Sequence, residues 1–345
     1  MVYDALAMVL TIGRITAVVL CALGLSAAAE QRYANIGNLP LTSGQIVRDC
    51  KIGYRAYGTL NGERSNVIVF PTWFGGTTAD LEAFGKIGPG ALADTDRYYV
   101  VTIDALGNGV SCSPSNSETT DGGPIETLSI DDMVRSQHAL LTSHLGIANA
   151  HAVMGISMGG MQTFRWLSMY PDFMDKAVAI DGTPRQTSYD LLQWDTHKHI
   201  VRALQAGGFS DADISVLKSR LTLLTLYTPA YFVETVPADA VDEFLRPQLV
   251  ASPSFRADDY VAQLEAMMTH DVIGDAGVAS YAGRIAAELL VVGTQSDQMV
   301  NPVPARELAA ALGARYVEIR SHCGHIGSSC EADTVVSRVA EFLAD

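Results

Sequence analysis

A serine lies between two glycines in segment 155–159, which reads GISMG. Glycines two positions before and two positions after the serine permit a sharp turn from a strand into a helix, and this turn pushes the hydroxyl group into a pocket. The helix that follows points its first backbone N–H groups at the same place. A pattern of five residues also arises by chance, so its surroundings must support it. Ser157 is the candidate nucleophile.

A serine hydroxyl group reacts slowly unless a histidine accepts its proton and a carboxylate orients that histidine. In an α/β sheet with such a turn, the acid and then the histidine follow later strands. The apolar segment 289–293 predicts one of these strands and is followed by Asp297, and segment 316–320 predicts the next and is followed by His325. We expect Ser157, Asp297 and His325 to form a catalytic triad.

Other residues compete for the two supporting roles. His322 lies three residues before His325, and it is either a hydrogen-bonding loop residue or the base itself. Asp271 and Asp275 lie in a helix-rich stretch, where carboxylates usually cap or solvate helix ends. Four further histidines are expected on helices in packing or surface roles, without the spacing of a zinc site: His138, His144, His197 and His199.

The same chemistry needs backbone N–H groups that bind the oxyanion of a tetrahedral intermediate. One is the amide of Met158, directly after the nucleophile. The other should come from the loop after the predicted strand at 65–70, where the chain continues PTWFGG. We expect Trp73 or Phe74 to supply this amide, and their side chains fit core or lid packing equally well.

The elements around the serine have the pattern that such a site requires. Apolar residues recur at helical spacing over 130–145, and an apolar run at 150–154 predicts a buried strand. A helix is expected over 159–170, ended by Pro171, and a further strand over 176–180. The serine therefore lies at the turn of a β-α-β unit, and we expect an α/β fold with a mostly parallel sheet.

Helical patterns replace the strand pattern between residues 184 and 284. Helices are expected over 189–205, 211–226, 237–245 and 258–269. We interpret residues 185–283 as a helical lid inserted between the sixth and seventh strands of a core formed by 30–184 and 284–345. Aromatic and methionine side chains in this region indicate a mostly apolar substrate site: Tyr227, Tyr231, Phe232, Phe244, Met267 and Met268.

The composition limits the class of partner. The chain has 345 residues with 48% hydrophobic content, which is enough for one large core and an inserted subdomain. Its formal net charge of −15 argues against binding to nucleic acid or to an anionic membrane surface. We expect a small-molecule ester as the partner, no metal and no cofactor, with a homodimer as the one protein assembly considered.

The first 29 residues have the pattern of an export signal. The apolar segment 15–25 follows Arg14, and three alanines at 27–29 form a small-residue cleavage site before Glu30. We interpret residues 1–29 as a signal peptide, with an uncleaved N-terminal anchor as the alternative. A periplasmic or secreted protein is expected.

Four cysteines remain after this segment, and in an oxidising compartment they can pair in three ways: Cys50, Cys112, Cys323 and Cys330. Cys323 and Cys330 flank His325, so a bridge between them would fix the loop that carries the candidate base. Free thiols that pack as small hydrophobic side chains are the alternative.

Several segments together resemble the homoserine O-acetyltransferase family of the α/β-hydrolase superfamily. They are Ser43-Gly44, YRAYGTLN at 54–61, Ser65-Asn66, GISMGGMQ at 155–162, Tyr170-Pro171-Asp172 and Gly324-His325. The resemblance covers about residues 36–345. It implies an α/β-hydrolase fold, an acyl-serine enzyme with Ser157, Asp297 and His325 as its triad, and a helical lid.

Two positions depart from that family. In the acetyltransferases an aspartate that helps to hold the amino acid follows the catalytic histidine, whereas Ile326 follows His325 here. The position of a substrate-binding arginine falls near Lys198, and a lysine cannot grip a carboxylate bidentately. Homoserine is therefore not the expected substrate.

We expect hydrolysis of a small carboxylic ester through an acyl-Ser157 intermediate. Export favours this reaction, because acetyl-CoA is a cytoplasmic metabolite whereas water and esters are available outside. O-acyl transfer to a small alcohol is the alternative. A non-catalytic binding protein is a third interpretation, disfavoured because all three triad positions are filled.

Overall fold

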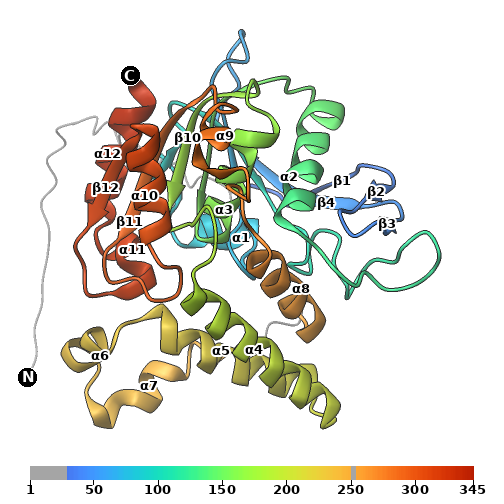
Figure 1. Ribbon diagram of the computed structural model, residues 1–345, viewed down its shortest axis with the longest axis vertical. Coiled ribbons are helices and arrows are strands. Elements are labelled where there is room, and N and C mark those ends of the chain that lie inside the picture. Colours follow the sequence, from blue (N-terminus) through green and yellow to red (C-terminus); the bar gives the residue numbers. More distant parts are fainter. Residues whose placement is uncertain (1–28, 250–253) are drawn as a thin grey trace, which may run out of the picture.

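One eight-stranded sheet runs through the centre of the computed structural model, which describes residues 29–249 and 254–345 (Figure 1). The strand order is β1-β4-β8-β5-β9-β10-β11-β12. From β8 to β12 all neighbouring strands are parallel, whereas β4 is antiparallel to both β1 and β8. The strands are β1 (Arg32–Asn35), β4 (Lys51–Tyr57), β5 (Val67–Pro71), β8 (Tyr99–Ile103), β9 (Ala150–Ile156), β10 (Met174–Ile180), β11 (Glu288–Thr294) and β12 (Arg315–Ile319). This confirms the predicted mostly parallel sheet.

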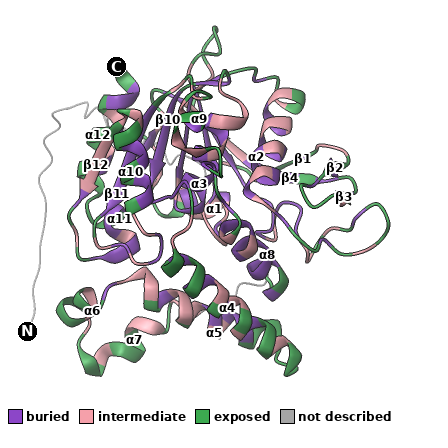
Figure 2. Ribbon diagram, in the orientation of Figure 1, coloured by how far each residue is buried: buried purple, intermediate pink, exposed green. Residues whose placement is uncertain are grey.

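Helices cover both faces of this sheet. On one face, α2 (Ile130–Ala139), α3 (Met158–Met169) and α10 (Val303–Leu312) share a core with Ala177 and Ala179 of β10. On the other face, α1 (Thr78–Ala83) and α12 (Ala332–Ala344) share a core with Val178 and Ile180 of the same strand. Alternate side chains of a strand point to opposite faces, and the part of β10 that is buried on both sides, 177–180, is apolar on both. Figure 2 shows the central strands buried.

Short elements complete the described core. Two pairs of two-residue strands lie outside the main sheet: β2 (Leu39–Pro40) with β3 (Ile46–Val47), and β6 (Ile87–Gly88) with β7 (Ala93–Asp94). The remaining short helices are η1 (Leu140–His144), α9 (Gly277–Ala282), η3 (Gly324–Ile326) and α11 (Gly327–Cys330). The single helix expected over 130–145 is thus an α-helix that ends at Ala139 and continues as the π-helical turn η1.

A separate layer of helices lies below the sheet in Figure 1. We call α4, α5, α6, α7 and α8 the lid helices; they follow β10 and precede β11, the sixth and seventh strands of the main sheet along the chain. Their bounds are α4 (Ser188–Ala206), α5 (Asp211–Leu226), α6 (Pro229–Thr235), α7 (Val241–Leu245) and α8 (Ala257–Met268), with the 3₁₀ turn η2 (Ala238–Ala240) before α7. The helix α9 belongs to the predicted lid range but packs on the core, where the Tyr281 hydroxyl group donates to the Phe164 carbonyl oxygen at 2.6 Å.

The helix α6 lies in a stretch for which no helix is predicted. The Thr228 hydroxyl group caps it by accepting the Tyr231 N–H, and Pro229 occupies its first turn. Proline fits the first turn of a helix because that position has no N–H partner to lose. A seven-residue helix with this start is too short to show a periodic apolar pattern.

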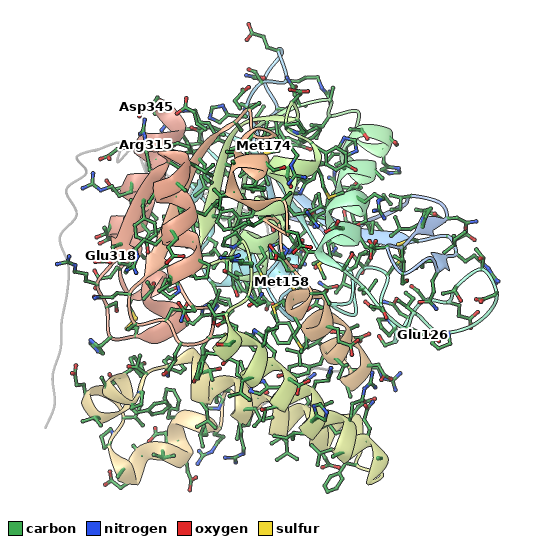
Figure 3. The ribbon with its side chains drawn as sticks, viewed as in Figure 1. Glu126, Met158, Met174, Arg315, Glu318 and Asp345 are labelled. Atoms are coloured by element: carbon green, nitrogen blue, oxygen red, sulfur yellow. A yellow bond between two sulfur atoms is a disulfide. The ribbon has the colours of Figure 1, made fainter. Side chains whose placement is uncertain are left out.

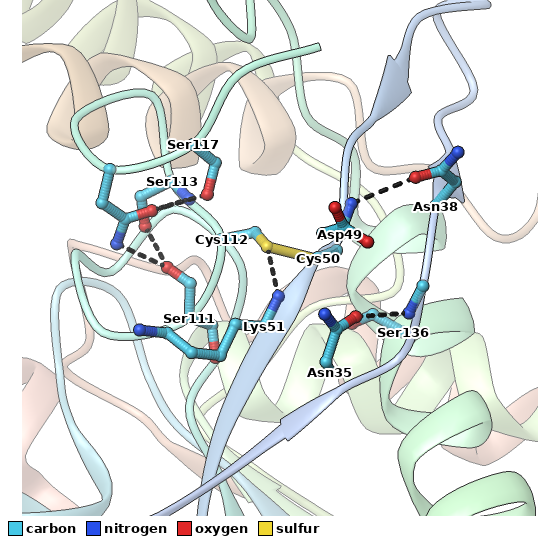
Figure 4. The surroundings of a disulfide bond; sticks show 12 residues. Asn35, Asn38, Asp49, Cys50, Lys51, Ser111, Cys112, Ser113, Ser117 and Ser136 are labelled. Carbon is cyan, nitrogen blue, oxygen red and sulfur yellow. Dashed lines mark hydrogen bonds between the residues drawn. A yellow bond between two sulfur atoms is a disulfide. The ribbon is translucent and has the colours of Figure 1, made fainter. Parts of the chain in front are cut away.

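The four described cysteines form two disulfides, Cys50–Cys112 and Cys323–Cys330. The first joins β4 to the loop after β8, and the Lys51 N–H donates to the Cys112 sulfur at 2.9 Å (Figure 4). Of the predicted signal peptide, only Ala29 falls within the described residues. Among helices of the described chain, none is long and apolar enough to cross a membrane.

Candidate active site

Ser157 occupies the sharp turn between β9 and α3, with φ of 58° and ψ of −122°. This backbone conformation is sterically unfavourable for a residue with a side chain. The two glycines of the motif make it feasible. A Cβ atom on Gly155 would collide with the Gly159 backbone, and one on Gly159 would lie 2.8 Å from the Pro71 carbonyl oxygen. The spacing G-x-S-x-G is therefore a requirement of this turn.

The structure brings the three predicted triad residues into one hydrogen-bonded chain. His325 Nε2 lies 2.8 Å from Ser157 Oγ, and His325 Nδ1 lies 2.6 Å from Asp297 Oδ2. The other carboxylate oxygen, Oδ1, accepts the N–H groups of Met299 at 2.8 Å and Val300 at 3.0 Å. Asp297 thus holds the imidazole with Nδ1 as donor, which leaves Nε2 free to accept the serine proton.

The charges around His325 favour its role as a base. Burial disfavours the protonated ring, but the charge and hydrogen bond of Asp297, together with the charge of Asp181, outweigh burial and raise the pKa of His325 above its usual value. A base with a raised pKa binds the proton of the serine hydroxyl group more tightly during attack. Asp181 was not singled out from the sequence, where its place directly after the predicted strand at 176–180 was the available signal.

The predicted oxyanion donors belong to the turn at Ser157 and to a loop that packs against α3. Met158 is the first residue of α3, labelled near the boundary between core and lid helices in Figure 3, and the first N–H groups of a helix have no partner within it. Within the described chain, the N–H groups of Trp73 and Phe74 donate to no other residue. The loop is held in place because the Gln162 side chain, on α3, donates to the Thr72 carbonyl oxygen at 3.0 Å. Gln162 belongs to the segment GISMGGMQ, but the sequence alone predicts no role for it.

The aromatic side chains of this loop pack as the alternative interpretation expected. The Phe74 ring lies 4.9 Å from the Tyr260 ring of α8 and 6.2 Å from the Trp194 ring of α4, measured between centroids. The Trp73 ring instead contacts Phe84 at the end of α1. Phe74 thus connects the loop at 71–76, called the oxyanion loop below, to the lid helices.

The lid helices cover the candidate triad. Ser157, Asp297 and His325 are 7%, 6% and 8% exposed. The segment between α5 and α6 lies directly on the histidine loop: a Cβ atom on Gly324 would be 2.8 Å from the Leu226 carbonyl oxygen, and the Thr228 hydroxyl group donates to the His322 carbonyl oxygen. The triad is therefore shielded from bulk water.

Of the competing residues, His322 and Asp271 have other partners, and Asp275 is exposed. His322 is half exposed and pairs with Glu234 at 3.2 Å, so it does not reach Ser157. Asp271 accepts the N–H groups of Ile273 and Gly274, which caps a turn.

The four histidines predicted on helices lie on helices. His138 stacks on Tyr170 and His197 contacts the Tyr260 hydroxyl group, whereas His144 and His199 lie near or at the surface. The described residues contain no group of three or more side chains that could hold a metal ion.

The structure also places the two residues that differ from the acetyltransferase pattern, Lys198 and Ile326. Lys198 lies on α4, where its ammonium group is 3.4 Å from Asp195 and 3.9 Å from Glu265. Among the described residues its ion pairs involve these two carboxylates and no member of the candidate triad. Ile326 follows His325 within η3 and is partly buried. The site therefore offers no free charged group at either position.

Comparisons with known proteins agree with this fold. A family model described as the alpha/beta hydrolase fold matches residues 66–214. A homoserine O-acetyltransferase of Thermobifida fusca is 30% identical and aligns with 91% of this chain and 94% of its own length. An ethyl acetate hydrolase of Pseudomonas veronii is 37% identical over 57% of this chain, and the aligned part spans 59% of that protein. The solved structure of the acetyl esterase MekB superposes with a TM-score of 0.83 at 27% identity, over 92% of this chain and 97% of that one.

The fold and the strained serine turn define an α/β hydrolase. Within that superfamily the chain belongs to the homoserine O-acetyltransferase-like family, as a divergent member. The similar proteins carry the names of ester hydrolases and of acyltransferases. The coarse assignment is therefore an ester hydrolase or acyltransferase.

Proposed function

We propose that this protein hydrolyses a small carboxylic ester through an acyl-Ser157 intermediate. One observation carries the proposal: a buried hydrogen-bonded chain runs from Ser157 Oγ through both nitrogens of His325 to Asp297. A serine in this environment is activated as a nucleophile because its proton has an acceptor at 2.8 Å.

The reaction follows from the positions of these atoms. Ser157 Oγ attacks the ester carbonyl carbon while its proton passes to His325 Nε2, and the oxyanion accepts hydrogen bonds from the N–H of Met158 and of Trp73 or Phe74. The bond to the alcohol oxygen then breaks, and this oxygen takes the proton from His325. Water next gives a proton to His325 and attacks the acyl carbon, and Ser157 leaves with that proton.

Two features favour water over an amino acid as the acceptor of the acyl group. Ile326 provides no carboxylate for a substrate ammonium group, and Lys198 is already paired with Asp195 and Glu265. Burying an ammonium ion without a partner costs several kcal/mol, by order of magnitude, which is enough to abolish millimolar binding. The Phe74 ring of the oxyanion loop packs on the rings of Trp194 and Tyr260, which makes the surroundings of the loop apolar.

O-acyl transfer to a small alcohol is the second candidate function. It is favoured by the Thermobifida fusca homoserine O-acetyltransferase, which aligns over 94% of its length, whereas the ethyl acetate hydrolase aligns over 59% of its own. Both reactions pass through the same acyl-serine and differ only in what attacks it. Neither needs a cofactor held by the protein.

We also propose that the protein works outside the cytoplasm. The disulfides Cys50–Cys112 and Cys323–Cys330 support this location, because such bonds persist in oxidising compartments. The small-molecule ester partner and the homodimer stay predictions.

A panel of p-nitrophenyl esters from acetate to octanoate, tested with the wild-type protein and with Ser157→Ala, examines the proposal. We expect the wild type to release nitrophenol with a preference for short acyl chains, and Ser157→Ala to lose at least about 10⁴-fold in kcat. Circular dichroism should show both proteins folded. Equal rates for the two folded proteins would contradict the assignment of Ser157.

A further inference from the structure

A second buried carboxylate lies at the same edge of the sheet as the candidate triad. Asp181 is the first residue after β10, and β10 lies between β9, which ends directly before Ser157, and β11, which ends shortly before Asp297. The carboxyl ends of neighbouring parallel strands meet at one edge of a sheet, where α/β proteins build their sites. The topology therefore places Asp181 between the strand of the nucleophile and the strand of the acid.

Hydrogen bonds connect Asp181 to the two loops that carry Asp297 and His325. Asp181 Oδ1 accepts the Thr294 N–H at 2.8 Å, and the Thr294 carbonyl oxygen accepts the Asp297 N–H at 3.1 Å. The side chain of Thr294 also packs so closely on Gly327, just after His325, that a Cβ atom there would collide with it. One intervening residue thus links Asp181 to both loops.

Stability alone does not explain a carboxylate at this position. Asp181 is 3% exposed and has a φ of 45°. The hydroxyl groups of Ser328 and Thr294 approach its carboxylate, but its Oδ2 accepts no hydrogen bond of normal geometry within the described chain. A buried polar oxygen without a donor and a left-handed backbone at a non-glycine residue are both unfavourable. Residues that break such local rules cluster at functional sites.

Four titratable groups act on Asp181: Asp297, His325, Lys86 and Tyr316. Burial and the like charge of Asp297 raise the pKa of Asp181 to about 6, and His325 opposes this shift. Lys86 donates to the Ser329 hydroxyl oxygen at 2.9 Å and so has a separate partner. Two carboxylates, Asp297 and Asp181, therefore act on one imidazole ring.

We propose that Asp181 is a positioning residue whose negative charge stabilises the imidazolium form of His325 that arises when Ser157 is acylated. Asp297 orients the ring through a hydrogen bond, whereas Asp181 acts through its charge and through the Thr294 backbone. This inference rests on the proposed function, because a His325 that accepts no proton needs no second carboxylate.

The variant Asp181→Asn removes the charge and keeps an oxygen that can accept the Thr294 N–H. Asp190→Asn is the matched control. Asp190 is also fully buried, also feels the charge of Asp297, and accepts the Asn301 N–H at 3.1 Å in the loop after Asp297. It is not among the groups that shift the pKa of His325.

The readout is the pH dependence of inactivation by a fluorophosphonate. Ser157 Oγ bonds to phosphorus, fluoride leaves, and the serine proton passes to His325, so the rate falls when His325 is already protonated. Because Asp181 raises the pKa of His325, its removal should shift this acidic limb to lower pH by about half a unit or more. The Asp190→Asn limb should coincide with that of the wild type.

An unchanged limb in Asp181→Asn, a shift to higher pH, or an equal shift in Asp190→Asn would overturn the inference. Asp181→Ser, which also lacks the charge, should shift the limb in the same direction and serves if the asparagine variant does not fold. Mass spectrometry of the treated wild type distinguishes failure of the proposed function from failure of the role of Asp181. If Ser157 is not labelled, the proposed function fails, whereas labelling with an unmoved limb rejects only the role of Asp181.

Discussion

His325 makes a hydrogen bond on each side of its ring, to Ser157 at 2.8 Å and to Asp297 at 2.6 Å. Neither hydrogen bond activates Ser157 without the other, because the ring must be both oriented by the carboxylate and in contact with the hydroxyl group. The three residues should therefore behave as a unit in kinetics.

His325→Ala should lower kcat for ester hydrolysis nearly as much as Ser157→Ala does, and the double variant should be little worse than either single variant. Asp297→Asn should be milder. His322→Ala is the matched control, since His322 lies in the same loop but pairs with Glu234 at 3.2 Å. Steady-state rates on one ester check all five variants. Loss of activity in His322→Ala with activity kept in His325→Ala would move the base by three residues.

Ser157 and Asp297 were predictable because each follows an apolar run long enough to be a buried strand, and His325 because it follows the next predicted strand, at 316–320. The structure brings these three residues into contact, since parallel strands end at a common edge. Asp181 and Gln162 were not assigned a role, because a carboxylate after a strand or an amide within a helix has many equivalent uses in a sequence. Their significance depends on partners far away in the chain, Thr294 for Asp181 and Thr72 for Gln162.

The two disulfides close loops of different length. Cys323–Cys330 closes a loop with a sequence separation of 7 around His325, whereas Cys50–Cys112 has a separation of 62 and ties β4 to the loop after β8. A chain-entropy estimate gives about 2 kcal/mol of stability for the short loop and about 4 kcal/mol for the long one. The smaller contribution to stability thus belongs to the bond that fixes the candidate base.

Replacing both cysteines of one disulfide by serine should give opposite rankings in activity and stability. We expect Cys323→Ser/Cys330→Ser to lower kcat more, because the His325 loop is freed. Cys50→Ser/Cys112→Ser should lower the melting temperature more. Ester hydrolysis and thermal unfolding of both double variants test this. A larger loss of kcat in Cys50→Ser/Cys112→Ser would contradict the proposed role of the short loop.

Element boundaries could be predicted only where the pattern was long. The helix α5 has the expected bounds, Asp211–Leu226, because sixteen residues show their pattern clearly. The change from α2 to the π-helical turn at Leu140 and the seven-residue α6 carry no such signal. Their geometry is decided by caps and tertiary packing.

At the scale of the whole molecule, a sheet buried on both faces holds the triad and a layer of helices encloses it (Figure 1). The Phe74 ring on Tyr260 and the Leu226 carbonyl oxygen over Gly324 connect that layer to the site at two points. Such enclosure limits the size of the substrate and the access of competing acceptors.

The mature protein should begin near Glu30 and be found outside the cytoplasm. The first 29 residues have the pattern of a cleavable signal, and the two disulfides require oxidising conditions to form. Mass spectrometry of the protein from exported and cytosolic fractions of its native host decides this. An intact N-terminus in the cytosolic fraction would contradict export and strengthen the case for acyl transfer from acetyl-CoA.

The fate of the acyl group tests the central claim most directly. The wild-type protein is supplied with an acetyl ester, and separately with acetyl-CoA, each with homoserine at high concentration, and free acetate and O-acetylhomoserine are quantified. Ile326 and the ion-paired Lys198 provide no grip on a zwitterionic acceptor. We therefore predict that acetate accounts for nearly all of the product and that homoserine does not accelerate turnover. A predominance of O-acetylhomoserine would contradict ester hydrolysis and assign the protein to acyl transfer.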